Sequence, residues 1–113
     1  MIQVYGIKNC DSVKKALSFF KKHDIAYTLH DFKTQALPSQ KIDEWLERVD
    51  MKTLFNAKST TYRNLKLKEL NLDDEAKKEW LCRENLLIKR PVVENNGDVI
   101  VGFNEENYTR NFL

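Results

Sequence analysis

Apolar residues at the start of the chain follow first a strand-like and then a helix-like spacing. Residues 2–5 form a short apolar-rich run that ends at Gly6, which predicts a first strand. The i, i+3, i+4, i+7 spacing of an amphipathic helix comes next, at Val13, Ala16, Leu17 and Phe20. The asparagine, aspartate and serine between residues 9 and 12 can each cap this helix. Residues 26–32 alternate as a second strand, so we expect the chain to open as β-α-β.

The middle of the chain has the pattern of several helices. Pro38 and Ser39 open a helix whose apolar face consists of Ile42, Trp45, Leu46 and Val49. A polar stretch, residues 56–64, precedes a third short helical segment. Asp73 caps a further helix, in which Trp80 is expected to belong to the core, as Trp45 does.

The C-terminal part predicts a hairpin and a last helix. Asn96-Gly97 lies between two β-branched runs, which is a strong hairpin signal, and Asn104 caps the final helix. The order β-α-β, helices, β-β-α around a four-stranded mixed sheet is the thioredoxin plan, an α/β fold. We expect one domain over residues 1–113, with a helical insertion at about 38–87.

Composition and charge indicate a globular domain and argue against a nucleic-acid-binding protein. The chain has 113 residues, 42% hydrophobic and 32% charged, which is ordinary for a globular domain with a core of its own. Its 19 basic and 17 acidic residues give a net charge of +2, so direct nucleic-acid binding is not expected. The basic surface of the first helix is interpreted as a solvated face, with an anion-attracting field as the alternative; it consists of Lys14, Lys15, Lys21 and Lys22.

Targeting signals and metal motifs are not apparent in the sequence. The N-terminus has no basic segment followed by a long apolar run, and no apolar run approaches the roughly 20 residues of a membrane span. We therefore expect a cytoplasmic protein with no membrane partner. Cys10 and Cys82 are far apart and have no neighbour at Cys-x-x-Cys spacing, so neither a disulfide framework nor a metal site is predicted. His23 and His30 are interpreted as ordinary surface or partly buried residues.

Cys10 is the candidate reactive residue. It follows the first strand and stands at the first turn of the first helix, where unpaired N–H groups and the helix dipole stabilise a thiolate. Ser12 can donate a further hydrogen bond, whereas the negative charge of Asp11 opposes the thiolate. The alternative is a small buried cysteine, but the polar neighbours favour exposure. Because residue 13 is valine, a redox cycle needs an outside thiol such as glutathione, or Cys82, which is interpreted as a packing residue.

Several segments carry a resemblance to a known family. Residues 5–16 read Tyr-Gly-Ile-Lys-Asn-Cys-Asp-Ser-Val-Lys-Lys-Ala, which resembles the signature of the ArsC/Spx family, and most closely that of its YffB-type branch. Four further segments are similar to family motifs and keep their order: residues 31–33, 59–63, 88–93 and 101–105. The resemblance covers nearly the whole chain.

The resemblance implies a cytoplasmic bacterial protein with a thioredoxin-like core and an inserted helical subdomain. It implies that Cys10 is the nucleophile and that Arg63 and Arg90 hold an anionic substrate. Pro91 would be the cis-proline that borders the site, and Ser12 a hydroxyl within it. No metal or bound cofactor is implied, and glutathione is the expected co-substrate. Taken singly, Arg63 can instead be a surface residue paired with an acid such as Glu69, and Arg90 can simply brace the turn before Pro91.

Two departures from the family pattern bear on function. The family's arsenate reductases have a third arginine just before the last helix, where this chain has Gly102-Phe103-Asn104, and nothing assigns that role to Arg110. Spx-type regulators usually carry Cys-x-x-Cys, and Val13 replaces its second cysteine.

Three functions stay open on the sequence alone. The first is a glutathione-dependent thiol reductase acting on arsenate or, in better agreement with the missing arginine, on a glutathione mixed disulfide. The second is an Spx-like transcriptional regulator that binds RNA polymerase. The third is a binding module for glutathione or small anions without turnover. The expected partners are glutathione or a small oxyanion, and a glutaredoxin-type protein; a monomer is the default.

Overall fold

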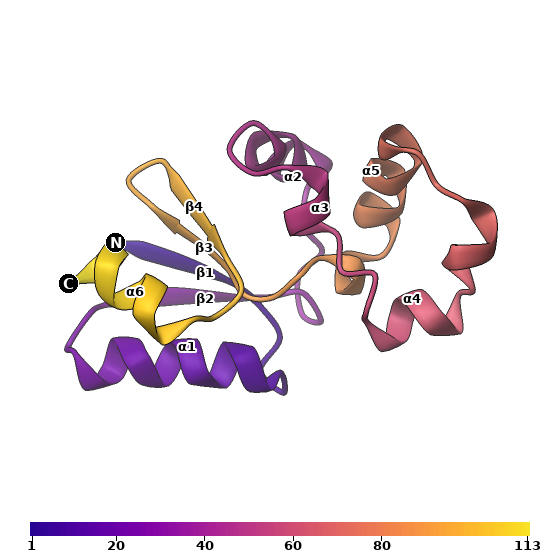
Figure 1. Ribbon diagram of the computed structural model, residues 1–113. Helices are drawn as coiled ribbons and strands as arrows, with labels where there is room; N and C mark the ends of the chain where they lie inside the picture. Colours follow the sequence, from indigo (N-terminus) through magenta and orange to yellow (C-terminus); the bar gives the residue numbers. More distant parts are fainter. The chain divides into compact units, whose positions relative to one another are not determined.

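The computed structural model describes residues 1–113 and divides into two units, drawn in Figure 1: a sheet unit, residues 1–35 with 90–113, and a helical unit, residues 36–89. The sheet unit contains β1 (Ile2–Gly6), α1 (Asp11–Lys22), β2 (Tyr27–Asp31), β3 (Val92–Asn95), β4 (Asp98–Val101) and α6 (Glu105–Phe112). The helical unit contains α2 (Ser39–Leu46), α3 (Met51–Leu54), α4 (Thr60–Asn64), the 3-10 helix η1 (Leu67–Leu70), α5 (Asp74–Arg83) and the 3-10 helix η2 (Asn85–Leu87).

The four strands form one mixed sheet in the order β2-β1-β3-β4. β1 and β2 run parallel, with Val4 opposite Leu29, and β3 is antiparallel to β1, with Val93 opposite Val4. Parallel strands need a crossover connection, and α1 supplies it. This arrangement confirms the predicted α/β, thioredoxin-like fold.

The β3–β4 connection is the hairpin that the sequence predicts. Asn96 and Gly97 both have positive φ angles, of 51° and 88°. Two successive residues at positive φ match the twist of the flanking strands, and asparagine and glycine adopt this backbone at the lowest cost. The strands on either side pair in register, with Asn95 opposite Asp98.

Aromatic side chains of α1 and α6 form much of the core of the sheet unit. Tyr108 is fully buried, and its ring lies 5.7 Å from that of Phe20 and 5.5 Å from that of Phe19. Its hydroxyl donates a 2.7 Å hydrogen bond to the carbonyl oxygen of Gly102. Burial raises the pKa of Tyr108 above its ordinary value. The core therefore holds α6 against α1 through one polar and several aromatic contacts.

The helical unit has an apolar core of its own, and side chains cap the starts of α3, α4 and α5 but not that of α2. The fully buried residues of this unit include Ile42, Trp45, Leu54, Leu81, Leu87 and Ile88. Asp50, Ser59 and Asp73 each accept a hydrogen bond from a backbone N–H of the first turn of α3, α4 and α5. The helices expected between residues 38 and 87 are present in this unit, and the assignment of both units to a single domain stays a prediction.

Three expectations for this unit are wrong in detail. Val49 lies beyond α2, which ends at Leu46, and the polar stretch 56–64 is itself partly helical because Ser59 caps α4 there. Trp80 is only half-buried, in contrast to Trp45, and the Arg83 guanidinium lies 4.7 Å from the centre of its ring. None of the helices in the chain combines the length and the apolar character that a membrane span requires.

Candidate functional site

Cys10 occupies the N-cap position of α1. Its backbone is extended, with φ −92° and ψ 127°, and its carbonyl oxygen accepts the first helical hydrogen bond from Lys14 N at 2.9 Å. The Cys10 N–H donates to Ile7 O at 3.3 Å, which closes the turn between β1 and α1. The prediction that an asparagine, aspartate or serine caps this helix is therefore wrong, because the turn places the cysteine there.

The first turn of α1 has no side-chain cap. No side chain accepts a hydrogen bond from the N–H groups that follow Cys10, although Ser12 is the second helical residue. The Cys10 side chain is partly exposed, as the polar neighbours predicted, and it forms no disulfide. Uncapped N–H groups at a helix start attract a negative charge, whether on a thiolate or on a bound anion.

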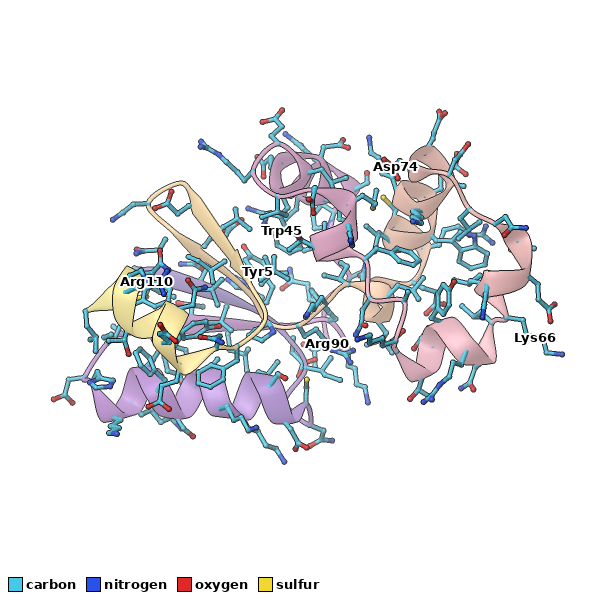
Figure 2. All side chains as sticks on the ribbon, viewed as in Figure 1. Tyr5, Trp45, Lys66, Asp74, Arg90 and Arg110 are labelled. Atoms are coloured by element: carbon cyan, nitrogen blue, oxygen red, sulfur yellow. The ribbon has the colours of Figure 1, made fainter.

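Arg90 and Pro91 lie at the entrance to β3. The peptide bond between them is cis, as the resemblance implied for Pro91. Pro91 is buried and its carbonyl oxygen accepts a 2.8 Å hydrogen bond from Gly102 N, whereas Arg90, labelled in Figure 2, is half-buried. No carboxylate forms an ion pair with the Arg90 guanidinium, so that its charge remains available to an anionic ligand.

Gly6 brings α1 and Arg90 together at the end of β1. A Cβ atom on Gly6 would lie 2.7 Å from Val13 Cγ2 and 3.8 Å from Arg90 Cβ. The Val13 methyl group therefore approaches the strand too closely for a side chain at residue 6, whereas Arg90 Cβ lies at an ordinary van der Waals distance. The stem of Arg90 and the helix that begins at Cys10 therefore pack against the same residue, which places two of the predicted site residues in one neighbourhood.

Arg63 belongs to the helical unit, in the last turn of α4. It is exposed, and its Nη2 lies 3.5 Å from Thr60 Oγ1; no ion pair joins it to Glu69, the alternative that the sequence left open. It lines a cavity of about 340 Å³ with Ala57, Tyr62, Lys66, Lys68 and Glu69. The roles of Arg63, Arg90, Pro91 and Ser12 around the Cys10 sulfur stay predictions.

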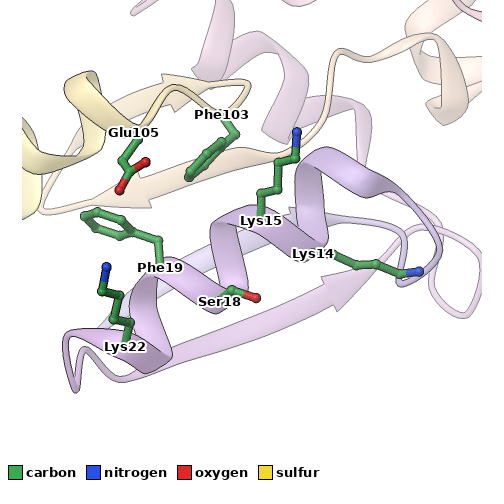
Figure 3. A pocket seen from close by; sticks show the side chains of 7 residues that line it. All are labelled: Lys14, Lys15, Ser18, Phe19, Lys22, Phe103 and Glu105. Carbon is green, nitrogen blue, oxygen red and sulfur yellow. The ribbon is translucent and has the colours of Figure 1, made fainter.

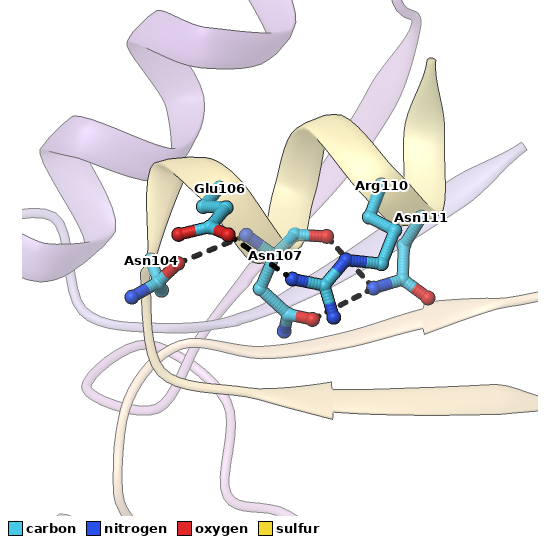
Figure 4. Close-up of polar contacts among 5 residues, drawn as sticks. All are labelled: Asn104, Glu106, Asn107, Arg110 and Asn111. Atoms are coloured by element: carbon cyan, nitrogen blue, oxygen red, sulfur yellow. Dashed lines mark hydrogen bonds and ion pairs between the residues drawn. The ribbon is translucent and has the colours of Figure 1, made fainter.

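Arg110 is engaged within its own helix. Its Nη2 lies 3.4 Å from Glu106 Oε1, one turn earlier on α6 (Figure 4). Asn104 caps the helix by accepting a hydrogen bond from Asn107 N at 2.9 Å, as the sequence predicted. The structure thus shows a local partner for this arginine.

Cys82 lies on α5 beside Lys78 and Arg83 and is partly buried. Burial raises the pKa of its thiol, and the negative charge of Asp43 acts in the same direction. Both effects favour the neutral thiol, which is the less reactive form. Cys82 is therefore a suitable internal reference for Cys10.

One surface feature, separate from the predicted site residues, is not predicted by the sequence. The face of α1 that carries the exposed Lys14, Lys15 and Lys22 borders a groove that Phe103 also lines (Figure 3). The spacing of the lysines along α1 predicts that they share one helix face, but no pattern in the sequence indicates that residue 103 lies against that face.

The sequence of the chain is similar to proteins of one family throughout its length. The ArsC family model matches residues 5–111. An uncharacterized protein of Haemophilus influenzae is 40% identical over 113 residues, which cover 99% of each chain. The global transcriptional regulator Spx of Lactiplantibacillus plantarum is 25% identical over 97% of this chain and 85% of its own.

Solved structures agree with this relationship. The structure of a protein named YFFB is 32% identical, covers 97% of both chains and superimposes with a TM-score of 0.90. The solution structure of an arsenate reductase (ArsC) related protein from Brucella melitensis is 36% identical, covers 98% of this chain and 93% of that one, and gives a TM-score of 0.77.

Proposed function

The chain belongs to the ArsC family, and from this premise we propose that it is a thiol oxidoreductase whose reactive group is the Cys10 sulfur. The position of Cys10 as the N-cap of α1, with no side chain capping the first turn, is the observation that carries the proposal. The free N–H groups and the positive end of the helix dipole stabilise negative charge on Sγ, and the thiolate is the nucleophilic form of cysteine.

The proposed substrate is a glutathione mixed disulfide, with glutathione as co-substrate. The Cys10 thiolate attacks the glutathione sulfur; a Cys10–glutathione disulfide forms while the original S–S bond breaks, and the released sulfur takes up a proton. A second glutathione thiolate then attacks the Cys10 disulfide, which frees the Cys10 thiolate and yields glutathione disulfide. An outside thiol is needed because Val13 occupies the position of a local resolving cysteine.

The unpaired charge of Arg90 supports an anionic substrate. The Arg90 guanidinium has no acidic partner, and an arginine fork binds carboxylates and oxyanions in bidentate fashion. In this proposal Arg63 supplies a second such group, Pro91 borders the site and Ser12 donates its hydroxyl. Arsenate is the less favoured substrate because Gly102-Phe103-Asn104 stands where the family's arsenate reductases have a third arginine. The proposed setting is the bacterial cytoplasm, where glutathione is reduced.

Replacing each cysteine in turn tests the proposal. We expect Cys10→Ser to abolish glutathione-dependent reduction of a cysteine–glutathione mixed disulfide, measured by coupling glutathione disulfide formation to NADPH oxidation through glutathione reductase. Cys82→Ser is the matched control and should keep the wild-type rate. We also expect oxidised glutathione to form an adduct at Cys10 and not at Cys82, detected by peptide mass spectrometry. Unchanged turnover in Cys10→Ser would contradict the proposal.

The Spx relative favours a second candidate, a regulator that binds RNA polymerase. Val13 is buried against Gly6, so a redox switch of the Cys-x-x-Cys kind is not part of this candidate. Co-elution of the protein with purified RNA polymerase core in gel filtration would support this candidate if the Cys10→Ser variant also co-elutes. Separate elution of the two would exclude it. Saturable binding of glutathione without formation of glutathione disulfide would instead support the third hypothesis, a binding module without turnover.

A further inference from the structure

A groove runs along α1 beside the start of α6, away from the residues assigned to thiol chemistry. It has a volume of about 490 Å³ and is lined by Lys14, Lys15, Ser18, Phe19, Lys22, Phe103 and Glu105. Figure 3 shows the two phenylalanine rings in the groove, with the lysines spread along the helix beside them. Its size falls within the range of ligand sites in proteins.

The aromatic floor of the groove is held in place by the core. Phe19 is 5% exposed, Phe103 is half-buried, and their ring centres are 6.5 Å apart at an interplanar angle of 65°. Both rings contact Tyr108, at 5.5 and 4.8 Å, and the Tyr108 hydroxyl is fixed by its bond to Gly102 O. An apolar side chain can therefore bind against preformed rings without ordering them first.

The rim of the groove is positively charged. Lys14, Lys15 and Lys22 form no ion pair, and Glu105 is the one acid among the lining residues. Three lysines against one glutamate give the groove a formal charge of +2, equal to that of the whole 113-residue chain. The charges of all other residues sum to zero, although the lining of the cavity at Arg63 also carries three basic residues against one acid. In the groove the positive rim borders two phenylalanine rings, which favours an acidic partner with an apolar side chain.

The spacing of the lysines indicates an extended occupant. At about 1.5 Å of rise per helical residue, Lys14 and Lys22 are separated by about 12 Å along α1. An extended peptide of four residues spans about 13 Å. A small anion meets only one end of this rim, whereas a short peptide reaches both ends while one side chain covers the rings.

We propose that the groove binds an acidic segment of a partner protein, with acidic residues on both sides of one apolar side chain that packs on Phe19 and Phe103. The acidic residues pair with Lys14, Lys15 and Lys22, and the segment avoids Glu105 at the α6 end. This binding surface does not depend on the chemistry of Cys10, so it holds or fails separately from the proposed reductase function.

Chemical-shift mapping with a defined probe tests the proposal. The probe is the blocked peptide Glu-Asp-Phe-Asp-Glu, added to the ¹⁵N-labelled full chain. We expect saturable shifts at the amides of Lys15, Phe19 and Phe103, weaker binding of the same peptide with alanine at its centre, and weaker binding at higher salt. No saturable shift, or shifts confined to other residues, would overturn the proposal.

Charge reversal supplies the matched variants. Lys15→Glu/Lys22→Glu should weaken binding by about tenfold or more, whereas Lys21→Glu/Lys33→Glu, at exposed lysines outside the groove, should change it by less than about threefold. If the two double variants lose equal affinity for the peptide, the effect comes from overall charge, and the assignment of the binding site to the groove is overturned. Equal affinity for phenylacetate would indicate a small aromatic acid instead, and displacement by a lower concentration of oligothymidylate would indicate nucleic acid.

Discussion

Gly6 is the residue on which the geometry around Cys10 depends most directly. It ends β1, and its missing side chain leaves room for the Val13 methyl group, while the stem of Arg90 lies at an ordinary van der Waals distance. Val13 is fully buried and β-branched, so it cannot turn its methyl group away without cost. The close approach is steric in origin: Gly6 is not among the residues with a positive φ angle.

Gly6→Ala should therefore destabilise the protein. The new Cβ would lie 2.7 Å from Val13 Cγ2, and relief of such overpacking costs about 1–3 kcal/mol of the free energy of unfolding. Urea denaturation measures the loss. Val13→Ala removes the clashing methyl, so the double variant Gly6→Ala/Val13→Ala should lose less than the sum of the two single variants. Strict additivity would show that this contact does not limit the packing.

Helix starts decide much of the structure at the scale of the element. α3, α4, α5 and α6 all begin with a side chain that accepts a backbone hydrogen bond, whereas α1 begins with Cys10 and has none. A cap contributes stability because it satisfies N–H groups that the helix itself leaves unpaired. The first turn of α2, which begins after Pro38, also has no side-chain cap, and of these two uncapped α-helices only α1 begins at a cysteine.

The cap of α5 offers a direct measurement of this contribution. Asp73 Oδ1 accepts a 2.9 Å hydrogen bond from Ala76 N. Asp73→Ala should lower the free energy of unfolding by about 1 kcal/mol and speed hydrogen exchange in the first turn of α5. Asp73→Asn keeps a capping oxygen and should stay close to wild type. Equal losses in both variants would indicate that the charge of Asp73, and not its hydrogen bond, stabilises the helix.

At the scale of the whole molecule, the buried hydroxyl of Tyr108 links stability to pH. Burial raises the pKa of Tyr108 in the folded state, while in the unfolded chain it titrates near its ordinary value of about 10. The neutral phenol is thus favoured by folding. Its stabilisation is complete below pH about 10 and is lost as the pH rises from there toward the folded-state pKa.

We accordingly expect stability to fall above pH about 10 more steeply in the wild type than in Tyr108→Phe, which has no group to titrate at this position. Thermal unfolding followed by circular dichroism between pH 8 and 11 measures the two slopes. Below pH about 9 the variant should be less stable by about 1–2 kcal/mol, because the Gly102 carbonyl loses its donor. Parallel slopes would show that other groups control alkaline unfolding.

The sequence by itself determined the elements of the sheet unit and the family. The strands, α1, the hairpin and α6 follow from apolar spacing and from Asn96-Gly97 and Asn104, because such preferences are set by a few neighbouring residues. The match of several ordered segments identified the ArsC/Spx family and the cis bond before Pro91. It also predicted the site residues Cys10, Ser12, Arg63, Arg90 and Pro91, whose roles stay predictions.

Only the tertiary structure decided the rest. Cys10 became the N-cap because its N–H bonds to Ile7 O, a choice between neighbouring caps that spacing does not resolve. The half-exposure of Trp80 depends on how much neighbouring structure covers α5, whereas its helical spacing resembles that of the buried Trp45. The basic groove exists because the fold brings Phe103 against α1, and contacts between residues distant in sequence leave no periodic trace along the chain.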